Sequence, residues 1–171
     1  MKIGRITLSD RAHAGIYEDL SGPEIERIVR DHLDSTAEVL SRILPDEPAQ
    51  IQAALLELCD QAGCDLVITT GGTGPGLRDV TPEATRAILT RELPGFGETM
   101  RALSFQKVPT AILSRATAGT RGQSLIINLP GNPRSIAECL PPLVPAIREC
   151  LKHLGESSAV QPCQLRSQKN P

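Results

Sequence analysis

Aromatic side chains are scarce in this sequence. Phe and Tyr together make up 2% of the residues, and Trp is absent. Such a chain has to build an aliphatic core, and it lacks the row of aromatic platforms on which single-stranded nucleic acids stack. Hydrophobic residues still make up 40% of the 171 residues and charged residues 22%. This balance is typical of a globular domain and excludes a disordered chain.

The sequence also lacks a strong net charge and long apolar runs. Its formal net charge of −2 creates no field that would attract nucleic acid or an anionic membrane, so any anionic ligand needs a local site. No run approaches the roughly 18 apolar residues of a membrane span. Met1–Arg5 leads directly into an expected strand, without a signal peptide. We expect a cytoplasmic protein with no nucleic-acid or membrane partner.

Cysteine and histidine follow no recognisable site pattern. The odd number of cysteines, the irregular spacing and the absence of a CxxC pair favour free thiols in or near the core. The cysteines and histidines together form no zinc-ligand pattern, and we expect the histidines to be solvated or at the core edge. The residues concerned are Cys59, Cys64, Cys139, Cys150 and Cys163, and His13, His32 and His153.

Strand-like and helix-like segments alternate along the chain. The expected strands cover residues 3–9, 37–44, 65–70, 110–114 and 125–129. The expected helices contain the apolar periodicity that starts at Ile25 and Ile51, or follow Thr81-Pro82, Pro94-Gly95 and Asn132-Pro133, with Thr81 and Asn132 as caps. This order predicts an α/β three-layer sandwich, with a mainly parallel central sheet flanked by helices. Ligands of such sheets bind beyond the carboxyl ends of the strands.

The limits of the domain follow from glycine, proline and polarity. Gly63 should end the second helix. Three prolines at 141, 142 and 145 should break or kink the last helix near Leu140. From Gly155 onward the chain is polar and without pattern. We expect one domain over residues 1–154, followed by a flexible tail over residues 155–171.

The strongest local signal is the segment Thr69–Gly76, which follows the most apolar strand. Five of its eight residues are glycine or proline. Glycines can turn backbone N–H groups inward and form a nest for a phosphate or another anion, although a tight turn would need the same residues. The segment is no P-loop, because Leu77-Arg78 stand where Lys-Ser/Thr is required. It is no dinucleotide fingerprint either, because GxGxxG is absent.

Two carboxylates follow strands that should run parallel. Asp79 lies between the glycine-rich segment and the next helix, where it would repel phosphate unless Mg²⁺ intervened. Asp46 follows the second expected strand. Each could instead be a helix cap. If both open onto one edge of the sheet, they are suited to holding Mg²⁺ for phosphoryl chemistry, which needs no protein nucleophile.

Three further segments could line the same edge. Pro130–Ser135 is a Pro-Gly turn that delivers a helix N-terminus, which could bind a second anion or simply be capped. Ser9-Asp10-Arg11 follows the first strand, and its signal is weaker. Ser114-Arg115 could bring a cation to the ligand or be solvated. These segments predict polar walls around the glycine-rich loop.

Taken together, these motifs resemble those of the MogA-type molybdopterin adenylyltransferases of molybdenum cofactor biosynthesis. They are also similar to those of the G domains of plant and animal cofactor-synthesis proteins, including gephyrin. The resemblance runs from about Lys2 to Leu154 and is lost in the tail. The motifs that carry it occur in the same order: Ser9-Asp10-Arg11, Leu44-Pro45-Asp46, Thr69–Gly74, Arg78–Thr85, Pro94–Glu98 and Leu129–Pro133.

The resemblance implies an enzyme that uses Mg²⁺ and ATP to adenylylate the terminal phosphate of molybdopterin and releases pyrophosphate. It implies that Asp46 and Asp79 are catalytic and organise Mg²⁺ and the phosphates. It further implies a homotrimer and a separate molybdotransferase that accepts the product. The residues expected to bind ATP or molybdopterin are Ser9, Asp10, Thr70, Gly71, Gly72, Thr73, Gly74, Pro75, Ser114, Arg115, Pro130, Gly131, Asn132, Pro133 and Ser135.

Other functions stay open at this level. A MoaB-like relative would bind molybdopterin but serve a neighbouring step. A non-enzymatic oligomeric scaffold would share the domain type, and an unrelated phosphate-binding regulator would keep the glycine-rich loop. The pair Asp46 and Asp79 favours catalysis over these alternatives. Spacing does not decide which loop holds adenylate and which holds the pterin.

Overall fold

The computed structural model describes residues 1–158 of the chain. Its strands are β1 Lys2–Leu8, β2 Glu38–Leu44, β3 Leu66–Thr70, β4 Arg91–Glu92, β5 Ala118–Arg121 and β6 Ser124–Leu129. Its helices are α1 Asp10–His13, α2 Ser21–His32, α3 Pro48–Leu56, the π-helical turn η1 Glu57–Gln61, α4 Thr81–Arg86, α5 Pro94–Phe105, the 3-10 helix η2 Pro109–Leu113 and α6 Pro133–Ser158.

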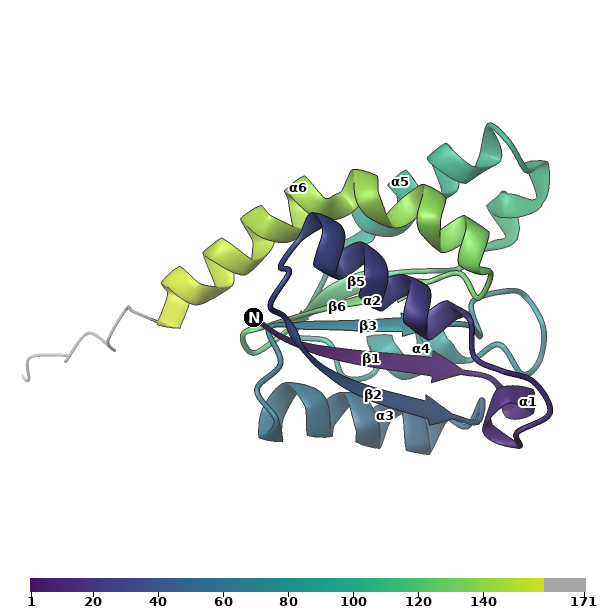
Figure 1. Ribbon diagram of the computed structural model, residues 1–171, viewed down its shortest axis with the longest axis horizontal. Coiled ribbons are helices and arrows are strands. Elements are labelled where there is room, and N and C mark those ends of the chain that lie inside the picture. Colours follow the sequence, from purple (N-terminus) through teal and green to yellow (C-terminus); the bar gives the residue numbers. More distant parts are fainter. Residues whose placement is uncertain (159–171) are drawn as a thin grey trace, which may run out of the picture.

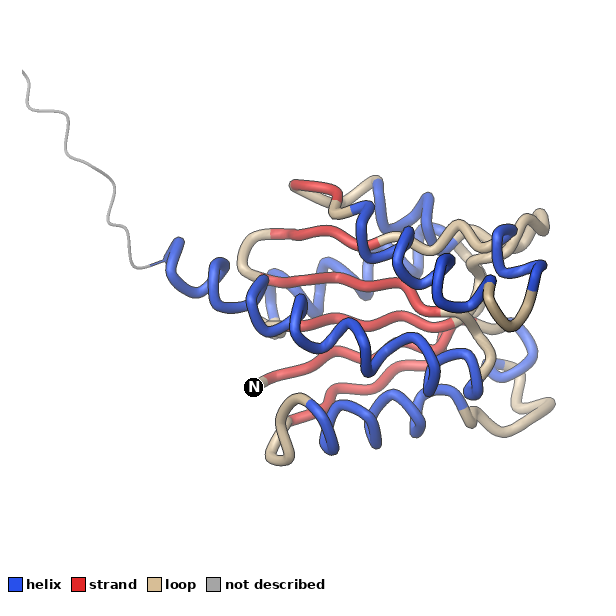
Figure 2. The backbone as a smooth tube through the Cα atoms, turned by 90° about the horizontal axis from the view of Figure 1, so that it is seen from above, coloured by secondary structure: helices blue, strands red, loops and turns tan. Residues whose placement is uncertain are grey.

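The strands form one sheet in the order β2-β1-β3-β6-β5-β4. The first four run parallel, whereas β5 pairs antiparallel with β6 and with β4. Figure 2 shows the strands side by side, with many of the loops gathered at one end. The predicted α/β sandwich with a mainly parallel sheet is confirmed.

Helices cover both faces of the sheet with aliphatic side chains. On one face α2, α5 and α6 pack on residues such as Ile3, Ile68 and Ile127. On the other face α3 and α4 pack on residues such as Ile6 and Ile126. Figure 1 shows α2 and α6 on one side of the strands and α3 on the other. Strands β3 and β6 are buried along their whole length, as the apolar run of β3 predicts.

The expected strand over residues 110–114 is wrong. This segment forms η2, and the side chains of Ile112 and Leu113 are 62% and 52% exposed. A strand there would lack core contacts, and Pro109 would add no N–H to a ladder. Strand β5, which was not predicted, pairs with β6 on the side away from β3. Gly122, at φ +53°, turns the chain between β5 and β6.

The last helix does not break near Leu140. It is continuous from Pro133 to Ser158 with all three prolines inside it, although its axis curves in Figure 1. The side chains of Ile136, Leu140 and Leu143 are buried on the sheet, and this packing offsets the hydrogen bonds that the prolines remove. Helix α6 therefore passes the expected domain end at Leu154. The rest of the expected tail, residues 159–171, lies outside the described residues.

The expectations for cysteine and histidine fit the described part of the chain. Cys59, Cys64, Cys139 and Cys150 are free thiols, and Cys163 lies outside the described residues. His13 is exposed and contacts the Ile43 carbonyl oxygen. Among residues 1–158, none of the helices combines the length and the apolar character that a bilayer span requires.

Candidate active site

The carboxyl ends of the four parallel strands bring the predicted site segments to one edge of the sheet. In register, Leu8 of β1 lies beside Leu44 of β2, Thr7 beside Thr70 of β3, and Thr70 beside Leu129 of β6. Figure 1 shows α1 and the neighbouring loops beyond these strand ends. Segments far apart in the sequence therefore converge because the strands are parallel and in register.

The first turn of the glycine-rich loop requires glycine twice. Gly71 and Gly72 have φ values of +96° and +60°. A Cβ on Gly71 would lie 2.2 Å from the carbonyl oxygen of Leu8, and one on Gly72 would lie 2.4 Å from Oγ1 of Thr81 and 2.9 Å from Oδ1 of Asp46. The loop thus needs glycine for backbone conformation and for close approach to a carboxylate.

Thr81 has a different role from the predicted N-cap. Helix α4 begins at Thr81, the cap position is Val80, and the cap makes no side-chain hydrogen bond. The hydroxyl of Thr81 instead donates to the Gly71 carbonyl oxygen at 2.9 Å, and its N–H donates to the Gly72 carbonyl oxygen at 3.1 Å. The residue ties the loop to α4, so the cap prediction is wrong because the hydroxyl has a tertiary partner.

Arg115 holds the second half of the loop. Its Nε donates to the Gly74 carbonyl oxygen at 2.8 Å, and its other nitrogens donate to the Asp79 carbonyl oxygen and to Glu83. Its own N–H donates to the Thr73 carbonyl oxygen at 2.8 Å. In this structure the guanidinium therefore braces the loop instead of being solvated.

Asp79 folds back over the loop that precedes it. Its Oδ2 accepts the Gly76 N–H at 2.8 Å, and a Cβ added to Gly74 or Gly76 would lie 2.9 or 2.7 Å from the same oxygen. Pro75, between the two glycines, is exposed. The small residues of this turn are what let the Asp79 carboxylate lie against the backbone.

Asp46 is not the cap of α3, because that position is Glu47 and makes no side-chain cap bond. Instead Asp46 faces Asp10, and the two exchange hydrogen bonds between backbone N–H groups and carboxylates. Arg78 donates to both Asp10 oxygens, at 3.0 and 2.8 Å, and to Glu47 at 2.8 Å. The sequence did not single out Arg78, which joins the loop to the ends of β1 and β2.

Ion pairing and burial shift the pKa values of Asp10 and Asp46 in opposite directions. The hydrogen bonds from Arg78 lower the pKa of Asp10. Burial raises the pKa of Asp46, against the hydrogen bond that it accepts from Asp10. The Oδ1 atom of Asp46 is buried and has no hydrogen-bond partner. A buried carboxylate oxygen without a partner is costly and suits a site completed by a ligand.

A cavity of about 380 Å³ opens between the glycine-rich loop and the connection from β1 to α2. We call it the larger cavity. It contains eight of the predicted site residues: Ser9, Asp46, Thr70, Gly71, Gly72, Asp79, Gly131 and Pro133. It also contains residues that were not predicted: Thr7, Leu8, Tyr17, Glu18, Asp19, Leu20, Ser21 and Arg78. The sequence could have indicated these residues in one way: most of them lie at or after the carboxyl end of β1, where ligands of parallel sheets bind.

A buried ion pair shapes that wall. Arg5 on β1 donates to Asp19 at 2.8 Å, and the Thr7 hydroxyl donates to the same Asp19 oxygen at 2.7 Å. The other oxygen of Asp19 accepts the N–H groups of Ser21 and Gly22 at 3.0 and 2.9 Å. Both Asp19 oxygens therefore accept hydrogen bonds from the protein, and these fix the start of α2 beside the cavity.

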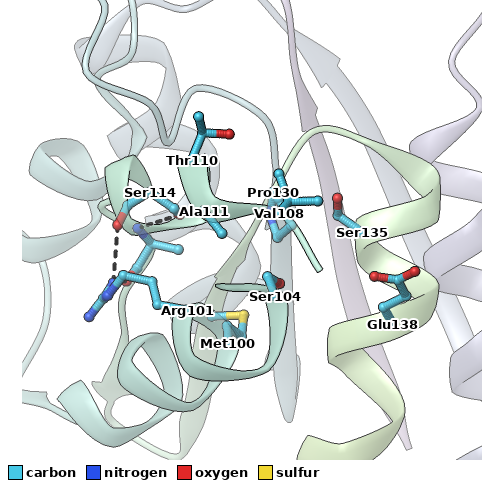
Figure 3. A pocket seen from close by; sticks show the side chains of 11 residues that line it. Met100, Arg101, Ser104, Val108, Thr110, Ala111, Ser114, Pro130, Ser135 and Glu138 are labelled. Atoms are coloured by element: carbon cyan, nitrogen blue, oxygen red, sulfur yellow. Dashed lines mark hydrogen bonds between the residues drawn. The ribbon is translucent and has the colours of Figure 1, made fainter. Parts of the chain in front are cut away.

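A second cavity, of about 150 Å³, lies between α5, η2 and the start of α6 (Figure 3). We call it the smaller cavity. Three predicted residues line it, namely Ser114, Pro130 and Ser135. Figure 3 shows Ser135 and Glu138 of α6 across the cavity from Ser104 and Met100 of α5. The predicted site set is thus divided between two cavities.

The Pro130–Pro133 turn separates the two cavities. The Thr70 hydroxyl donates to the Pro130 carbonyl oxygen and the Ser21 hydroxyl to that of Gly131, both at 2.7 Å. Asn132 Oδ1 accepts the Arg134 N–H at 2.9 Å, so the predicted cap of α6 is confirmed. Some predicted residues line neither cavity: Asp10, Thr73, Gly74, Pro75, Arg115 and Asn132.

The donor set is compatible with Mg²⁺. Within residues 1–158, His, Cys, Asp and Glu side chains form no group of three or more around a common point. Mg²⁺ does not need such a cage, because it keeps several waters and usually binds one or two carboxylates together with substrate phosphates. The unpartnered oxygen of Asp46, close to Gly72, fits this pattern.

The chain is similar to known proteins in sequence and in fold. Residues 4–149 match the family described as "Probable molybdopterin binding domain". The chain is 54% identical over 149 residues to a molybdopterin adenylyltransferase of Helicobacter pylori, covering 87% of this chain and 85% of that protein. It is 51% identical over 140 residues to the molybdopterin adenylyltransferase of Escherichia coli K12, covering 82% of this chain and 72% of that protein. The crystal structure of the molybdopterin biosynthesis enzyme MoaB from Thermus thermophilus superposes with a TM-score of 0.83 at 39% identity. The match covers 91% of this chain and 96% of that chain.

Proposed function

The chain belongs to the family of molybdopterin-binding domains, and we propose that it is a molybdopterin adenylyltransferase that uses Mg-ATP. The observation that carries this proposal is the buried, unpartnered Oδ1 of Asp46 beside the Gly71-Gly72 turn. Asp79 lines the same cavity. Carboxylates and a glycine-rich turn in one cavity favour a metal-bound polyphosphate over a simple anion, which the carboxylates would repel.

The proposed reaction forms one phosphorus–oxygen bond and breaks another. An oxygen of the terminal phosphate of molybdopterin attacks the α-phosphorus of ATP. The bond from that phosphorus to the bridging oxygen breaks, its electron pair leaves with pyrophosphate, and adenylyl-molybdopterin results. Because a phosphate monoester is largely deprotonated at neutral pH, the step needs neither a protein nucleophile nor a strong general base.

The protein contributes position and charge. When bound, Mg²⁺ supplies neutralisation of the phosphate charge, and we assign Asp46 and Asp79 to hold it. The N–H groups of the glycine-rich loop orient the phosphates. Arg78 keeps Asp10 close to Asp46 and thereby sets the position of the Asp46 carboxylate.

We assign the nucleotide to the larger cavity and the pterin to the smaller one. The larger cavity contains both aspartates and the Gly71-Gly72 turn, which suit a triphosphate. The smaller cavity has Ser104, Thr110, Ser114 and Ser135 along its wall, and hydroxyls of this kind can both donate to and accept from a heterocycle. The Pro130–Pro133 turn between the two is where the phosphates of both substrates would meet.

Further proposals concern assembly and place of action. By its resemblance to MogA-type enzymes, we propose a homotrimer and a separate molybdotransferase that accepts the product. A reaction that consumes ATP also favours the cytoplasm as its compartment. Sedimentation of the full chain would test the trimer.

The decisive experiment incubates the purified full chain with molybdopterin, Mg²⁺ and ATP labelled at the α-phosphorus. The label should appear in adenylyl-molybdopterin in equal amount to released pyrophosphate, and omission of Mg²⁺ should stop both. If molybdopterin binds but no label is transferred, the enzyme proposal is overturned in favour of a molybdopterin-binding protein or scaffold.

A further inference from the structure

The connection between α1 and α2 exposes three large apolar side chains. Ile16 is 66% exposed, Tyr17 47% and Leu20 62%. Two of them, Tyr17 and Leu20, line the larger cavity, and Ile16 does not. Apolar groups at the wall of a cavity that also contains Asp46, Asp79 and the Gly71-Gly72 turn suit a ligand with an apolar part as well as a charged part.

Tyr17 is held in place before any ligand arrives. Its hydroxyl lies 2.6 Å from Oγ of Ser9, and that Oγ also accepts the Ala12 N–H in the cap of α1. The Cζ atom of Arg11 lies 5.1 Å from the ring centroid, a cation–π distance. A ring oriented in this way loses little freedom when a ligand packs on it.

The contacts of Tyr17 leave about half of its side chain exposed. Arg11 lies over the ring, the side chain is 47% exposed, and Tyr17 is one of the residues that line the cavity. The ring therefore offers a flat π surface in the same cavity as Asp46, Asp79 and the Gly71-Gly72 turn. A molecule that fits both parts is a planar aromatic base joined to a polyphosphate.

We propose that Tyr17 is the platform on which the base of the nucleotide stacks, with Leu20 as a neighbouring apolar contact. This inference rests on the proposed function, because it names the part of the nucleotide that this wall of the cavity binds. Stacking recognises a π face instead of a hydrogen-bonding pattern, so Tyr17 contributes affinity for the base. It contributes equally to the ground state and the transition state, so its loss falls mainly on KM.

The composition of the chain provides a direct measurement. It contains one Tyr and no Trp, so tyrosine fluorescence reports on Tyr17 alone. Titration of the full chain with Mg-ATP should quench this emission to saturation, whereas inorganic triphosphate with Mg²⁺, which has no base, should not quench it. N-acetyltyrosinamide titrated in parallel corrects for light absorbed by adenine.

Variants separate stacking from a general effect on the loop. Tyr17→Leu keeps an apolar side chain but removes the π surface, and it should raise the KM for ATP by about 5- to 100-fold. Tyr17→Phe keeps the ring and should restore most of the affinity. Ile16→Ala, in the same exposed loop but outside the cavity, is the matched control and should bind ATP like the wild type. Calorimetry of each variant with Mg-ATP gives the affinity without relying on turnover.

Two results would overturn the inference while leaving the proposed function in place. One is that ATP binds by calorimetry without quenching Tyr17. The other is that Tyr17→Leu and Ile16→Ala bind ATP equally well. Quenching by molybdopterin but not by ATP would overturn it in favour of the pterin at this wall. If the wild-type chain binds no nucleotide at all, both this inference and the proposed function fall.

Discussion

Asp10 and Asp46 exchange hydrogen bonds between the ends of β1 and β2. The Asp10 N–H donates to Oδ2 of Asp46 at 3.1 Å, and the Asp46 N–H donates to Oδ1 of Asp10 at 3.0 Å. The exchange fixes the Asp46 carboxylate through one oxygen and leaves the other, buried, without a partner. The charge of Asp10 is offset by Arg78. The two neighbouring carboxylates can therefore lie side by side, because Arg78 compensates the negative charge of one of them.

Replacement of Asp79 should separate activity from folding. Asp79→Asn removes a negative charge from the proposed metal site, while the amide oxygen can still accept the Gly76 N–H. We expect a loss of turnover of about 100-fold or more, since a bound metal contributes several kcal/mol to such reactions and each tenfold is about 1.4 kcal/mol. The thermal melting curve should be unchanged.

The matched control is Asp31→Asn, which removes an exposed carboxylate on α2, far from the loop in sequence and not part of either cavity. It should leave turnover as in the wild type. Wild-type turnover in Asp79→Asn would remove this residue from the proposed metal site.

The charged carboxylate of Asp46 should lower the free energy of unfolding at neutral pH, compared with an uncharged side chain at this position. Burial raises the pKa of Asp46 above its ordinary value of 3.8, so the folded state binds the proton more tightly than the unfolded chain. The free energy of unfolding therefore falls as the pH rises from the ordinary value through the raised one. Asp46→Asn cannot titrate and should be inactive but as stable as the wild type, or more stable, at neutral pH.

Urea unfolding of wild type and Asp46→Asn at about pH 4 and about pH 8 measures this effect. The difference in favour of the variant should be larger at the higher pH. A variant that is less stable at the higher pH would show that the carboxylate stabilises the folded protein, against the burial argument.

The pair formed by Arg5 and Asp19 should be important for stability. Their side chains are 9% and 7% exposed. Arg5→Met removes the guanidinium and leaves the Asp19 carboxylate with hydrogen bonds from neutral groups but without its cation, and we expect a loss of about 3–5 kcal/mol in the free energy of unfolding. Asp19→Asn in the same background should restore part of it, because the stranded charge is then gone. If urea unfolding shows that the losses in free energy of unfolding of the two single variants simply add in the double variant, the two residues are not coupled.

The buried cysteines should resist modification. Burial raises the pKa of Cys59 to about 11 and of Cys139 to about 12, and it also raises the pKa values of Cys64 and Cys150. The thiolate is the reactive form, so these thiols should react slowly at neutral pH. In a Cys163→Ser background, a native thiol titration should modify Cys150 first, because it is the least buried of the four. Fast modification of Cys139 would contradict the described packing.

Local chemistry explains which features were predictable. The apolar run of β3 and the glycines after it are adjacent in sequence, so the buried strand and its loop could be recognised together. Asp46 and Asp79 could be expected at one edge because parallel strands end at the same edge. Whether either was a helix cap or a member of the site could not be decided, because caps and metal ligands use the same side chains at the same positions.

Other features depended on partners distant in sequence. The hydroxyl of Thr81 donates to the Gly71 carbonyl oxygen. Arg115, which follows η2 in the sequence, donates to the Gly74 carbonyl oxygen. Strand β5 is short and contains Gly119, so its pattern is weak until β6 pairs with it. Of the predicted break or kink in α6, the break is wrong, because the helix is buried on the sheet and runs on through its prolines, while its axis curves (Figure 1).

The sequence by itself determined the class of fold, the glycine-rich loop and the two aspartates, because strand burial, turn conformation and charge act over a few neighbouring residues. Only the tertiary structure decided that the predicted residues divide between two cavities and that Arg78 and Asp10 position Asp46. It also decided that the loop after α1 forms a wall of the larger cavity. These outcomes depend on which strand ends lie next to each other, and that is set by the packing of the whole sheet.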